Sequence, residues 1–478
     1  MQSVAESLDR LAAIAASPTV ARLAAAFAAA GHELSLVGGP VRDALLGREV
    51  HDLDFTTDAR PDAIVRLLSP LADAVWDIGR AYGTIGAVFG EKAVEITTYR
   101  SDSYDGTTRK PDVEFGDALE GDLLRRDFTV NALALRVPEV RLVDPSGGVE
   151  HLLARVLTTP SSPEVSFGDD PLRMLRAARF AAQLGFEVDD QTRAAMAAMA
   201  DRIEIVSAER IRDELGKLLM SDRPRPGIEL LVSTGLAERV LPELPALRLE
   251  VDEHHHHKDV YQHSLTVLEQ AIEYEKERHP GDAPDLTLRL AALLHDIGKP
   301  ATRRFEPGGA VSFYHHDVVG AKLAKKRLTA LRFDKATIES VSRLIELHLR
   351  FLGYTEGAWT DSAVRRYVRD AGPELERLHI LTRADVTTRN RRKADRLGFA
   401  YDDLEQRIAS LKEQEELDAV RPDLDGQQVM ALLGIKPGRE VGQAMTYLLD
   451  LRLDQGSLGE EEAARRLLSW WSERSAEA

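Results

Sequence analysis

The chain has 478 residues, of which 44% are hydrophobic and 29% are charged, a composition typical of a globular protein of about three domains. It contains no cysteine, which excludes disulfides and thiolate metal sites and leaves His, Asp and Glu as possible metal ligands. Its net charge of −17 argues against a surface coated with nucleic acid, so any RNA contact must be local.

The first predicted elements belong to a small α/β domain. Residues 4–30 carry apolar residues at helical spacing and stop at Gly31, and residues 33–39 form a short strand that runs into a tight turn. The longest apolar run, residues 23–30, is far too short to span a membrane, and no leader-like segment opens the sequence, so we expect a cytoplasmic protein without membrane contacts. The pattern then alternates to about residue 145, with strands expected at 86–90, 93–99 and 140–145 and helices at 61–68 and 128–135.

Helical patterns dominate the rest of the chain. No internal repeat or low-complexity linker marks the boundaries, which are therefore drawn from changes in composition. We predict an α/β head (1–148), an arginine-rich helical neck (149–248), a histidine-rich helical domain (249–400) and a helical tail (401–478).

A glycine pair and two aspartates lie close together in the stretch LVGGPVRDALLGREVHDLDFTT. Asp52 and Asp54, two residues apart on a strand, would project from the same face and repel by about 4 kcal/mol at a separation of about 4 Å. A divalent metal with oxygen ligands, such as Mg²⁺, would relieve this repulsion. Gly38 and Gly39 let the backbone approach a phosphate, which Arg42 can neutralise. The alternative is a glycine turn followed by surface aspartates.

Two further motifs follow in the chain. In LLRRDFTVNALAL, Arg126 and Asp127 precede an apolar run, as charged residues at a helix start would. In FGDDPLRMLRAARFAAQLGF, Asp170 precedes the proline at the first helical position. Asp170 is either a helix cap or, with Arg173 one turn away, an acceptor and donor pair for the edge of a base. The arginines of this helix form a ladder of unpaired cations along one edge: Arg173, Arg176 and Arg179.

These three motifs, in this order, resemble the signature motifs of class II CCA-adding tRNA nucleotidyltransferases, a family within the DNA polymerase β-like nucleotidyltransferase superfamily. The resemblance covers roughly residues 30–245. It implies a polymerase β-like head that adds C, C and A to the 3′ end of tRNA from CTP and ATP without a nucleic-acid template. It also implies that Asp52 and Asp54 bind Mg²⁺ and activate the 3′-hydroxyl of the tRNA.

The same resemblance implies roles for the residues that contact the nucleotide. Asp170 and Arg173 would be an amino-acid template that pairs with CTP and then with ATP, in preference to a helix cap. The family pattern usually has Glu where this chain has Asp169. The residues implied to bind the nucleotide are Gly39, Arg42, Arg126, Asp127, Asp170, Arg173, Arg176 and Arg179.

The segment between the first two motifs is expected to assist the change from C addition to A addition. Residues 99–117 are rich in Gly, Ser, Thr and Asp and include Arg100 and Arg109, as a mobile hinge would require. This segment favours complete CCA addition over CC addition alone. Glu95, on the preceding strand, could supply a third carboxylate to the metals or serve as the general base. The alternative is that it is an ordinary strand residue.

Histidines and acidic residues spread over the third block indicate a second chemistry. Imidazoles and carboxylates that converge from several helices form a mononuclear or dinuclear metal site without sulfur. The sequence ALLHDIGKP resembles the HD superfamily of metal-dependent phosphohydrolases, and Lys299 fits its extended motif. This resemblance implies a second divalent metal, of unknown identity, and a possible phosphatase or cyclic phosphodiesterase. The predicted ligands, each inside a helical stretch, are His263, His295, Asp296, His316, His348 and Asp385.

Basic segments are the candidates for contact with the tRNA backbone. TRNRRKADR, which begins at residue 388, and AKKRLTALR at 324–332 are each basic enough to follow phosphates, although a charged helix face explains them equally well. We predict that the run His254 to His257 is solvated or faces RNA. A poly(A) polymerase, an HD phosphohydrolase with a degenerate head, and a non-catalytic tRNA-binding protein are the alternative functions.

Overall fold

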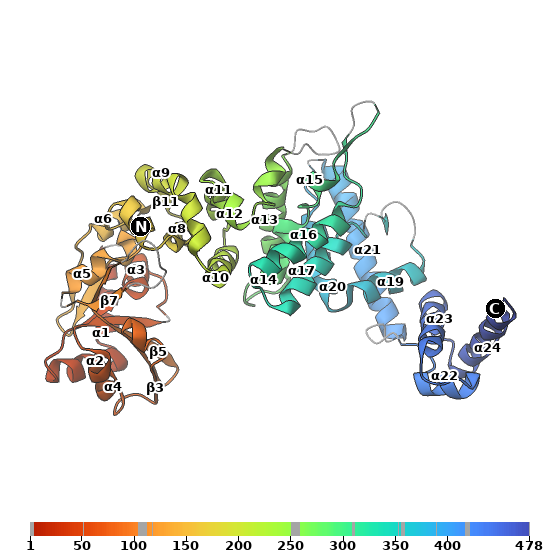
Figure 1. Ribbon diagram of the computed structural model, residues 1–478, viewed down its shortest axis with the longest axis horizontal. Coiled ribbons are helices and arrows are strands. Elements are labelled where there is room, and N and C mark those ends of the chain that lie inside the picture. The colour runs from red at the N-terminus through yellow and green to blue at the C-terminus, as the bar shows by residue number, and fades with distance from the viewer. Residues whose placement is uncertain are drawn as a thin grey trace. The chain divides into compact units, whose positions relative to one another are not determined.

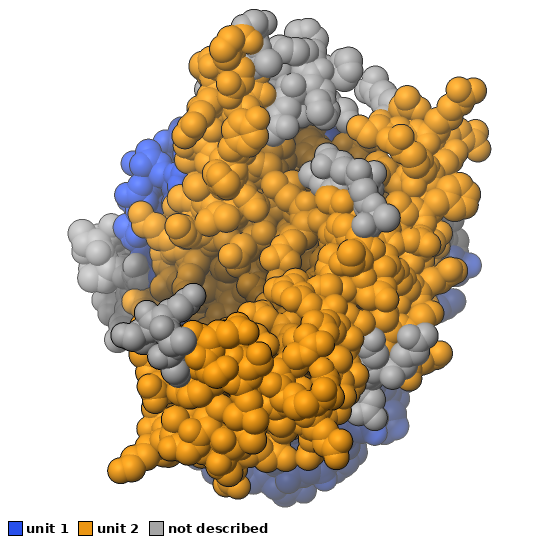
Figure 2. Space-filling model, turned by 90° about the vertical axis from the view of Figure 1, so that its right-hand side faces the viewer, with its two compact units in different colours: residues 1–242 blue, residues 243–478 orange. Residues whose placement is uncertain are grey.

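The computed structural model describes residues 4–50, 52–103, 112–116, 118–249, 259–307, 311–351, 353–354, 359–388, 390–415 and 421–477. The chain forms two compact units, residues 1–242 and 243–478, which are coloured separately in Figure 2. Each unit is described by itself below. The finer division into head, neck, third domain and tail remains a prediction.

A mixed seven-stranded sheet with the strand order β3-β4-β5-β2-β1-β8-β9 is the centre of the first unit (Figure 1). Strands β2 and β5 are parallel, and the other neighbouring strands that the structure describes are antiparallel. The helices α1 and α2 pack on this sheet through buried side chains such as Leu11 and Phe27. The strands are β1 (Leu34–Val37), β2 (Leu53–Thr57), β3 (Ala74–Trp76), β4 (Thr84–Phe89), β5 (Lys92–Thr98), β8 (Ala134–Val137) and β9 (Arg141–Val143).

The α/β head and the helical remainder confirm the predicted fold class, with two local corrections. The predicted helix at 4–30 is two helices, α1 (Val4–Ala15) and α2 (Pro18–Ala29), because Pro18 starts a new helix after Ser17. The predicted helix at 128–135 is wrong. Residues 129–131 form one 3₁₀ turn, and β8 follows between β1 and β9. A strand buried on both faces is a continuous apolar run, which periodicity cannot distinguish from a buried helix.

The predicted hinge at 99–117 is described only in part. Its ends form the antiparallel pair β6 (Arg100–Ser103) and β7 (Asp112–Phe115). Arg109 lies outside the described residues, as do the other residues of 104–111 and residue 117. The hinge therefore stays a prediction.

The first unit continues as a helical region in which α8 is central. Helices α10 and α11 both pack on α8. Gly227 of α11 permits a close approach, because a Cβ there would lie 2.3 Å from the carbonyl oxygen of Ala178. The remaining elements of this unit are α3 (Gly39–Leu46), α4 (Pro61–Leu68), α5 (Leu119–Leu124), α6 (Gly148–Ala154), β10 (Val156–Leu157), α7 (Pro163–Asp169), α8 (Leu172–Leu184), β11 (Glu187–Val188), α9 (Asp190–Ala198), α10 (Ala208–Leu219), α11 (Arg225–Ser233) and α12 (Leu236–Val240).

The described residues of the second unit are almost entirely helical, apart from the short strand pair of β12 and β13. Its last three helices share a separate small core that includes Val429 and Leu467. The elements are α13 (Val260–Arg278), α14 (Leu286–Leu294), α15 (Lys299–Thr302), β12 (Arg304–Phe305), β13 (Val311–Ser312), α16 (His316–Ala330), α17 (Lys335–Leu347), α19 (Asp361–Ala371), α20 (Leu375–Ala384), α21 (Arg391–Glu415), α22 (Gly426–Leu433), α23 (Arg439–Gln455) and α24 (Glu460–Glu477).

Among the described residues, no single helix has the length and apolar character needed to cross a membrane. The pair α1 and α2, bent by 64°, passes such a test only when the two helices are taken together, and by length and composition alone.

Candidate functional site

Three carboxylates gather where β2 and β5 lie side by side. Asp54 is half-buried on β2, and Asp52 is exposed immediately before that strand begins at Leu53. Glu95, on β5, pairs in parallel register with Asp54 on β2, so both side chains project from the same face of the sheet. Burial, then the charges of Glu95 and Asp52, raise the pKa of Asp54 to about 6, although Arg126 opposes the shift. A hard divalent cation fits this set of oxygen donors, because it removes the repulsion among the three carboxylates.

The glycine turn lies against the second motif. Gly38 precedes α3 with a φ of 72°, a conformation that favours glycine. A Cβ at Gly38 would lie only 3.1 Å from Nη1 of Arg126, so the missing side chain allows Arg126 to approach the turn. Arg42, in the first turn of α3, is buried. It donates to both carboxylate oxygens of Asp43 at 2.9 Å and to Oδ1 of Asn131 at 2.6 Å.

Asp127 connects the second motif to the arginine-bearing helix α8. Its Oδ1 accepts hydrogen bonds from the backbone N–H of Phe128 at 2.8 Å and from Nδ2 of Asn131 at 3.0 Å. Its Oδ2 accepts from Nε of Arg176, on α8, at 2.8 Å and also from Nη2 of the same side chain. Burial opposes the charge on Asp127, but Arg176 and these hydrogen bonds hold its pKa below the usual range. The carboxylate is therefore fixed as an anion between two motifs that are 49 residues apart.

The arginine ladder on α8 is not unpaired, which corrects the sequence prediction. Arg173 is buried and donates to Oγ of Ser166 at 2.8 Å and to the carbonyl oxygen of Arg125 at 2.6 Å. Arg179 donates to Oε2 of Glu214 at 2.6 Å, and Arg176 lies 3.7 Å from Oε1 of the same residue. Buried cations require such partners, and here the chain itself supplies them.

One aromatic ring lies beside three of these cations. The guanidinium carbons of Arg42, Arg176 and Arg179 lie 5.3, 5.5 and 4.1 Å from the ring centroid of Phe180. Phe180 is itself buried on α8. The ring therefore orders three side chains that come from both the head and the neck.

Asp170 lies between α7 and α8. Its Oδ1 accepts from the backbone N–H of Leu172, the first residue of α8, at 3.1 Å, although the N-cap residue of α8 is Pro171. Its Oδ2 accepts from Nη2 of Arg210 at 2.8 Å. The side chain is 22% exposed, so these hydrogen bonds do not close it off from a ligand.

The second unit brings together all six predicted metal ligands. Two groups form, each with ligand atoms within 4.8 Å of one another. His263 lies within α13 and His316 is the first residue of α16, whereas the other four residues lie at or just after helix ends. The expectation that each ligand lies inside a helical stretch is therefore wrong. The first group is His263, His295 and Asp385, and the second is Asp296, His316 and His348.

In three of these histidines a backbone carbonyl occupies Nδ1, which leaves Nε2 available to a cation. Nδ1 of His295, His316 and His348 lies 2.9, 2.8 and 2.6 Å from the carbonyl oxygens of Ala292, Phe313 and Ile345. A backbone acceptor at Nδ1 fixes the proton there and leaves Nε2 as a lone-pair donor.

Several inward-facing atoms have no hydrogen bond. Among the residues that the structure describes, Nε2 of His295, Nε2 of His348 and Oδ2 of Asp296 are buried without a hydrogen bond of good geometry, although Oδ2 of Asp296 lies 2.9 Å from Nζ of Lys299 and 3.2 Å from Nε2 of His295. Burial opposes charge on His295, but Asp296 and Asp385 raise its pKa to about 10, while burial and His295 lower the pKa of His348 to about 4. Burial also opposes charge on Asp296, whose pKa His295 and Lys299 nevertheless hold well below its usual range. The cluster thus fits a divalent cation, which would satisfy the orphaned atoms.

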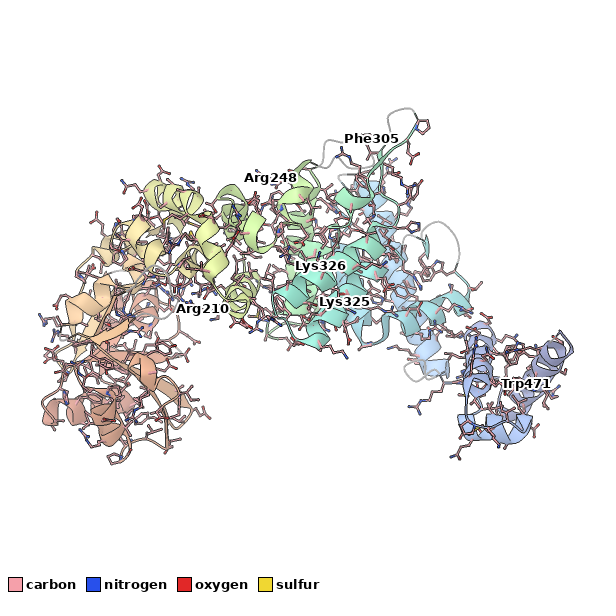
Figure 3. The ribbon with its side chains drawn as sticks, in the orientation of Figure 1. Arg210, Arg248, Phe305, Lys325, Lys326 and Trp471 are labelled. Carbon is pink, nitrogen blue, oxygen red and sulfur yellow. The ribbon has the colours of Figure 1, made fainter. Side chains whose placement is uncertain are left out.

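The predicted RNA-facing segments are only partly described. Lys325 and Lys326 project from the exposed side of α16 (Figure 3). The first residues of α21 are also exposed and basic, namely Arg391, Arg392, Lys393 and Arg396. Arg389 and the run His254 to His257 lie outside the described residues.

Sequence reasoning missed four residues that position the others: Asn131, Phe180, Arg210 and Glu214. Arg210 and Glu214 lie four residues apart on α10, so they share one helix face. Glu214 contacts Arg179 of α8, and Arg210 contacts Asp170, which lies two residues before α8 begins. Their spacing in SAERIRDELGKLL was visible in the sequence, but their partners lie 35 and 40 residues away.

Comparison with known proteins matches these regions in order. Residues 34–158 match the poly A polymerase head domain, residues 185–247 a probable RNA and SrmB-binding site of polymerase A, and residues 260–390 the HD domain. The chain is similar in fold to the crystal structure of the Bacillus stearothermophilus CCA-adding enzyme in complex with CTP, with a TM-score of 0.66 and 24% identity over 97% of this chain and 100% of that one. The fold and site therefore define a nucleotidyltransferase with a polymerase-type head and an HD domain, two domain types that imply use of divalent metals.

Two relatives match nearly the whole chain. An A-adding tRNA nucleotidyltransferase of Deinococcus radiodurans is 37% identical over 92% of this chain and 96% of its own length. A CC-adding tRNA nucleotidyltransferase of Thermus thermophilus is 34% identical over 91% and 93%, respectively. The chain belongs to the class II CCA-adding tRNA nucleotidyltransferase family.

Proposed function

We propose that this protein adds C, C and A to the 3′ end of tRNA from CTP and ATP by template-independent nucleotidyl transfer. The observation that carries the proposal is the continuous network Arg176–Asp127–Asn131–Arg42, which joins the glycine turn, the second motif and the arginine helix. These three motifs meet in one compact unit, beside Asp54 on β2 and Asp52 just before that strand. Such a transfer depends mainly on positioning and on neutralisation of phosphate charge.

Asp52 and Asp54 are the residues proposed to hold Mg²⁺. Glu95, on β5, lies opposite Asp54 on β2. Mg²⁺ bound there would favour ionisation of the tRNA 3′-hydroxyl and offset charge on the nucleotide phosphates. Arg42, Arg126, Arg176 and Arg179 are proposed to hold the nucleotide phosphates and sugar, with the glycine turn at Gly39 beside them. Because Arg42, Arg176 and Arg179 are paired with the chain's own acceptors, nucleotide binding would exchange some of these contacts for phosphate oxygens.

Asp170 and Arg173 are proposed to select the base. Cytosine and adenine each present an amino group, which a carboxylate accepts, beside a ring nitrogen that accepts from a guanidinium. Uracil and guanine present a carbonyl where cytosine and adenine present the amino group, so Asp170 would repel them. Residues of the protein would thereby replace a template strand.

Extension of a tRNA that lacks its last three nucleotides, with CTP, ATP and MgCl₂, tests the proposal. We expect growth by three nucleotides, and a loss of about 10²-fold to 10³-fold in rate for Asp54→Ala. Asp170→Ala should lower selection against UTP and GTP. Asp190→Ala, an exposed aspartate near the start of a neck helix, is the matched control and should act like the wild type. Absence of any extension by the wild type would refute the proposal.

The same experiment separates complete CCA addition from partial addition. The two nearly full-length relatives carry the names A-adding and CC-adding, so a partial reaction is the principal alternative. We propose the complete reaction, and we expect CTP alone to add two residues to the shortened tRNA and ATP to add one to a tRNA ending in CC. A poly(A) polymerase would instead use ATP alone and continue beyond one residue. We also propose that the protein acts in the cytoplasm.

A second candidate activity is supported by the histidine cluster of the second unit. A set of four histidines and two aspartates, four of the six residues buried, is suited to hydrolysis of a phosphate ester assisted by a divalent metal. We propose a metal-dependent phosphohydrolase, tested by phosphate release or ring opening from RNA ending in a 3′ or a 2′,3′-cyclic phosphate. The activity should persist in Asp52→Ala, which disables the head, and disappear in Asp296→Ala. Equal activity in both variants would exclude this site as its source.

A further inference from the structure

The antiparallel strands β12 and β13 lie close to the metal cluster of the second unit. β13 ends at Ser312, four residues before the cluster residue His316. Phe305 on β12 pairs with Val311 on β13. Because each residue of extended chain spans at most about 3.6 Å, Val311 lies within about 18 Å of His316. The strand pair is therefore attached to the cluster at short range.

One face of this strand pair leads to the cluster. Phe305 and its partner Val311 project to the same face, and Phe313, two residues after Val311, follows on that face. Phe313 is buried, and Nζ of Lys299 lies 5.7 Å from its ring centroid. The same Nζ lies 2.9 Å from Oδ2 of Asp296, which belongs to the cluster. The face that carries Phe305 therefore continues to the candidate metal site.

Phe305 presents an exposed aromatic ring with a cation beside it. Its side chain, labelled in Figure 3, is 73% exposed. The guanidinium carbon of Arg303 lies 4.9 Å from the ring centroid, and Arg304 is also exposed. A single exposed aromatic residue is ordinary on a protein surface. A ring with cations, beside a site suited to phosphate esters, has instead the composition of a surface that binds single-stranded nucleic acid.

The charge and chemistry of this surface favour RNA as its occupant. The chain carries a net charge of −17, so an aromatic ring beside basic side chains is a local feature that suits a polyanion. Each nucleotide supplies both a flat base that stacks on a ring and a phosphate that a guanidinium binds. The nearby acidic residue Glu306 accepts a hydrogen bond from Oγ of Ser312 at 2.6 Å. Both of these residues alternate with Phe305 and Val311, and they therefore lie on the opposite face.

We propose that Phe305 and Arg303 form a subsite for single-stranded RNA, in which a base near the RNA end stacks on Phe305 and Arg303 contacts the adjoining phosphate, while the terminal phosphate lies at the metal cluster. This inference rests on the proposed phosphohydrolase function of that cluster. It names the substrate class as an oligoribonucleotide with a terminal phosphate. A small phosphate ester would occupy the cluster alone and would not contact Phe305.

Comparison of a long substrate with a small one tests the subsite. Phosphate ester hydrolysis by the full chain is measured with RNA tetranucleotides that end in a 3′ or a 2′,3′-cyclic phosphate, and with p-nitrophenyl phosphate and bis(p-nitrophenyl) phosphate. We expect Phe305→Ala to lower kcat/KM for the tetranucleotides about tenfold, mainly through KM, and to leave the small esters unchanged. Phe305→Tyr, which keeps a ring, should act like the wild type. An equal loss with both kinds of substrate would overturn the inference.

A binding experiment tests the subsite without hydrolysis. A tetranucleotide with a 3′-phosphate and 4-thiouridine as its second-last nucleoside is cross-linked to the full chain by ultraviolet light, and the linked peptide is identified by mass spectrometry. We expect the link within residues 303–305, with an apparent affinity about tenfold weaker in Phe305→Ala. The slope of log affinity against log salt should become about 0.7 shallower in Arg303→Ala and stay unchanged in Phe305→Ala.

Phe399→Ala is the matched control. Phe399 lies on α21 in the same unit and is 74% exposed, and none of the six predicted metal ligands lies on that helix. Its kcat/KM for the tetranucleotides and its cross-link should equal those of the wild type. Wild-type behaviour of Phe305→Ala in both experiments, or a loss of similar size in Phe399→Ala, would contradict the proposed subsite.

The two experiments separate this inference from the proposed function. If the wild type hydrolyses none of the substrates but the cross-link lies within residues 303–305 and weakens in Phe305→Ala, the phosphohydrolase proposal is wrong and the RNA subsite stands. If the wild type hydrolyses both kinds of substrate without dependence on Phe305 and the cross-link lies elsewhere, the subsite is wrong and the phosphohydrolase stands. A cross-link elsewhere together with no hydrolysis would refute both.

Discussion

The two units handle buried charge in opposite ways. In the first unit, the buried or half-buried arginines of the nucleotide site are paired with acceptors of the chain itself, as Arg176 is with Asp127 and Arg179 with Glu214. In the second unit, buried imidazole and carboxylate atoms converge with no hydrogen-bond partner for Nε2 of His295 or Nε2 of His348, among the described residues. In the first site each cation has an anionic or polar partner, whereas the second site keeps buried ligand atoms that a divalent cation would satisfy.

This difference determines which kind of ligand each site can bind. A network of ion pairs can admit an anionic nucleotide by exchanging partners, because each arginine has more donors than its carboxylate partner occupies. A rigid cluster with orphaned lone pairs cannot rearrange at low cost and therefore demands one type of ligand. Repeated exchange of nucleotides suits the first arrangement, and a resident metal suits the second.

The largest expected effect is the response of the second unit to metal removal. A ligand that binds only the native state at about 1,000 times its Kd contributes about 4 kcal/mol, which corresponds to roughly 10 °C in melting temperature for a unit of this size. We expect a chelator to lower one calorimetric transition of the full chain by that amount. Addition of excess Mn²⁺ or Zn²⁺ should restore it.

Two variants assign that transition. Asp296→Asn removes a carboxylate from the cluster and should abolish the response to the chelator, whereas Asp54→Ala, in the head, should leave it intact. A wild-type protein whose melting temperature does not change with the chelator would show that the cluster tolerates its orphaned atoms without a cation.

The second largest expected effect concerns the stability that the ion pair between Arg176 and Asp127 gives to the first unit. Asp127→Ala leaves Arg176 without its main partner, which for a buried pair costs about 3 kcal/mol or more. We expect the first unit to unfold at a clearly lower denaturant concentration and the rate of nucleotide addition to fall. The exposed pair Arg193 and Asp190 is the control, since Asp190→Ala should cost less than about 1 kcal/mol. Equal costs for the two variants would mean that Arg176 finds another anion.

Much of this comparison was predictable from the sequence. The glycine turn, the order of the three motifs and the six candidate metal ligands were visible because short motifs carry local chemistry. The helix at 61–68 was also predicted with the bounds observed for α4. The glycine turn and the helix at 61–68 depend on neighbouring residues, which periodicity and turn chemistry report directly, whereas the six ligands, spread between residues 263 and 385, came from the resemblance to the HD superfamily.

What the sequence did not reveal depends on partners distant in the chain. The arginine ladder was expected to be unpaired because Asp127 and Glu214, which neutralise it, lie 49 and 35 residues away from Arg176 and Arg179. The apolar run at 128–135 was read as a helix because only the sheet shows that β1 and β9 flank it. The four-domain division and the catalytic roles of the site residues remain predictions.

The smallest expected effect is the pH dependence of metal binding in the head. Burial, Glu95 and Asp52 raise the pKa of Asp54 to about 6, above the ordinary value of 3.8. Without a metal, ionised Asp54 therefore disfavours the native state above pH 6, and this penalty shrinks as the pH falls from about 6 and is gone only below the ordinary pKa of 3.8. A bound cation removes the same penalty, so protons and metal compete for the site. We expect affinity for Mg²⁺ or Mn²⁺ to be about tenfold weaker at pH 5 than at pH 7.

Glu95→Gln tests the cause of this shift. The substitution removes the charge opposite Asp54 while keeping the shape of the side chain, so the pKa of Asp54 should fall and the pH at which affinity declines should move below 6. Titration of the Asp296→Asn variant with Mn²⁺ at several pH values would follow the head site without the cluster of the second unit. An affinity independent of pH between 5 and 7 would mean that Asp54 is already ionised at pH 5. The head would then resemble the second unit, where Asp296 and Asp385 are held ionised by the groups around them.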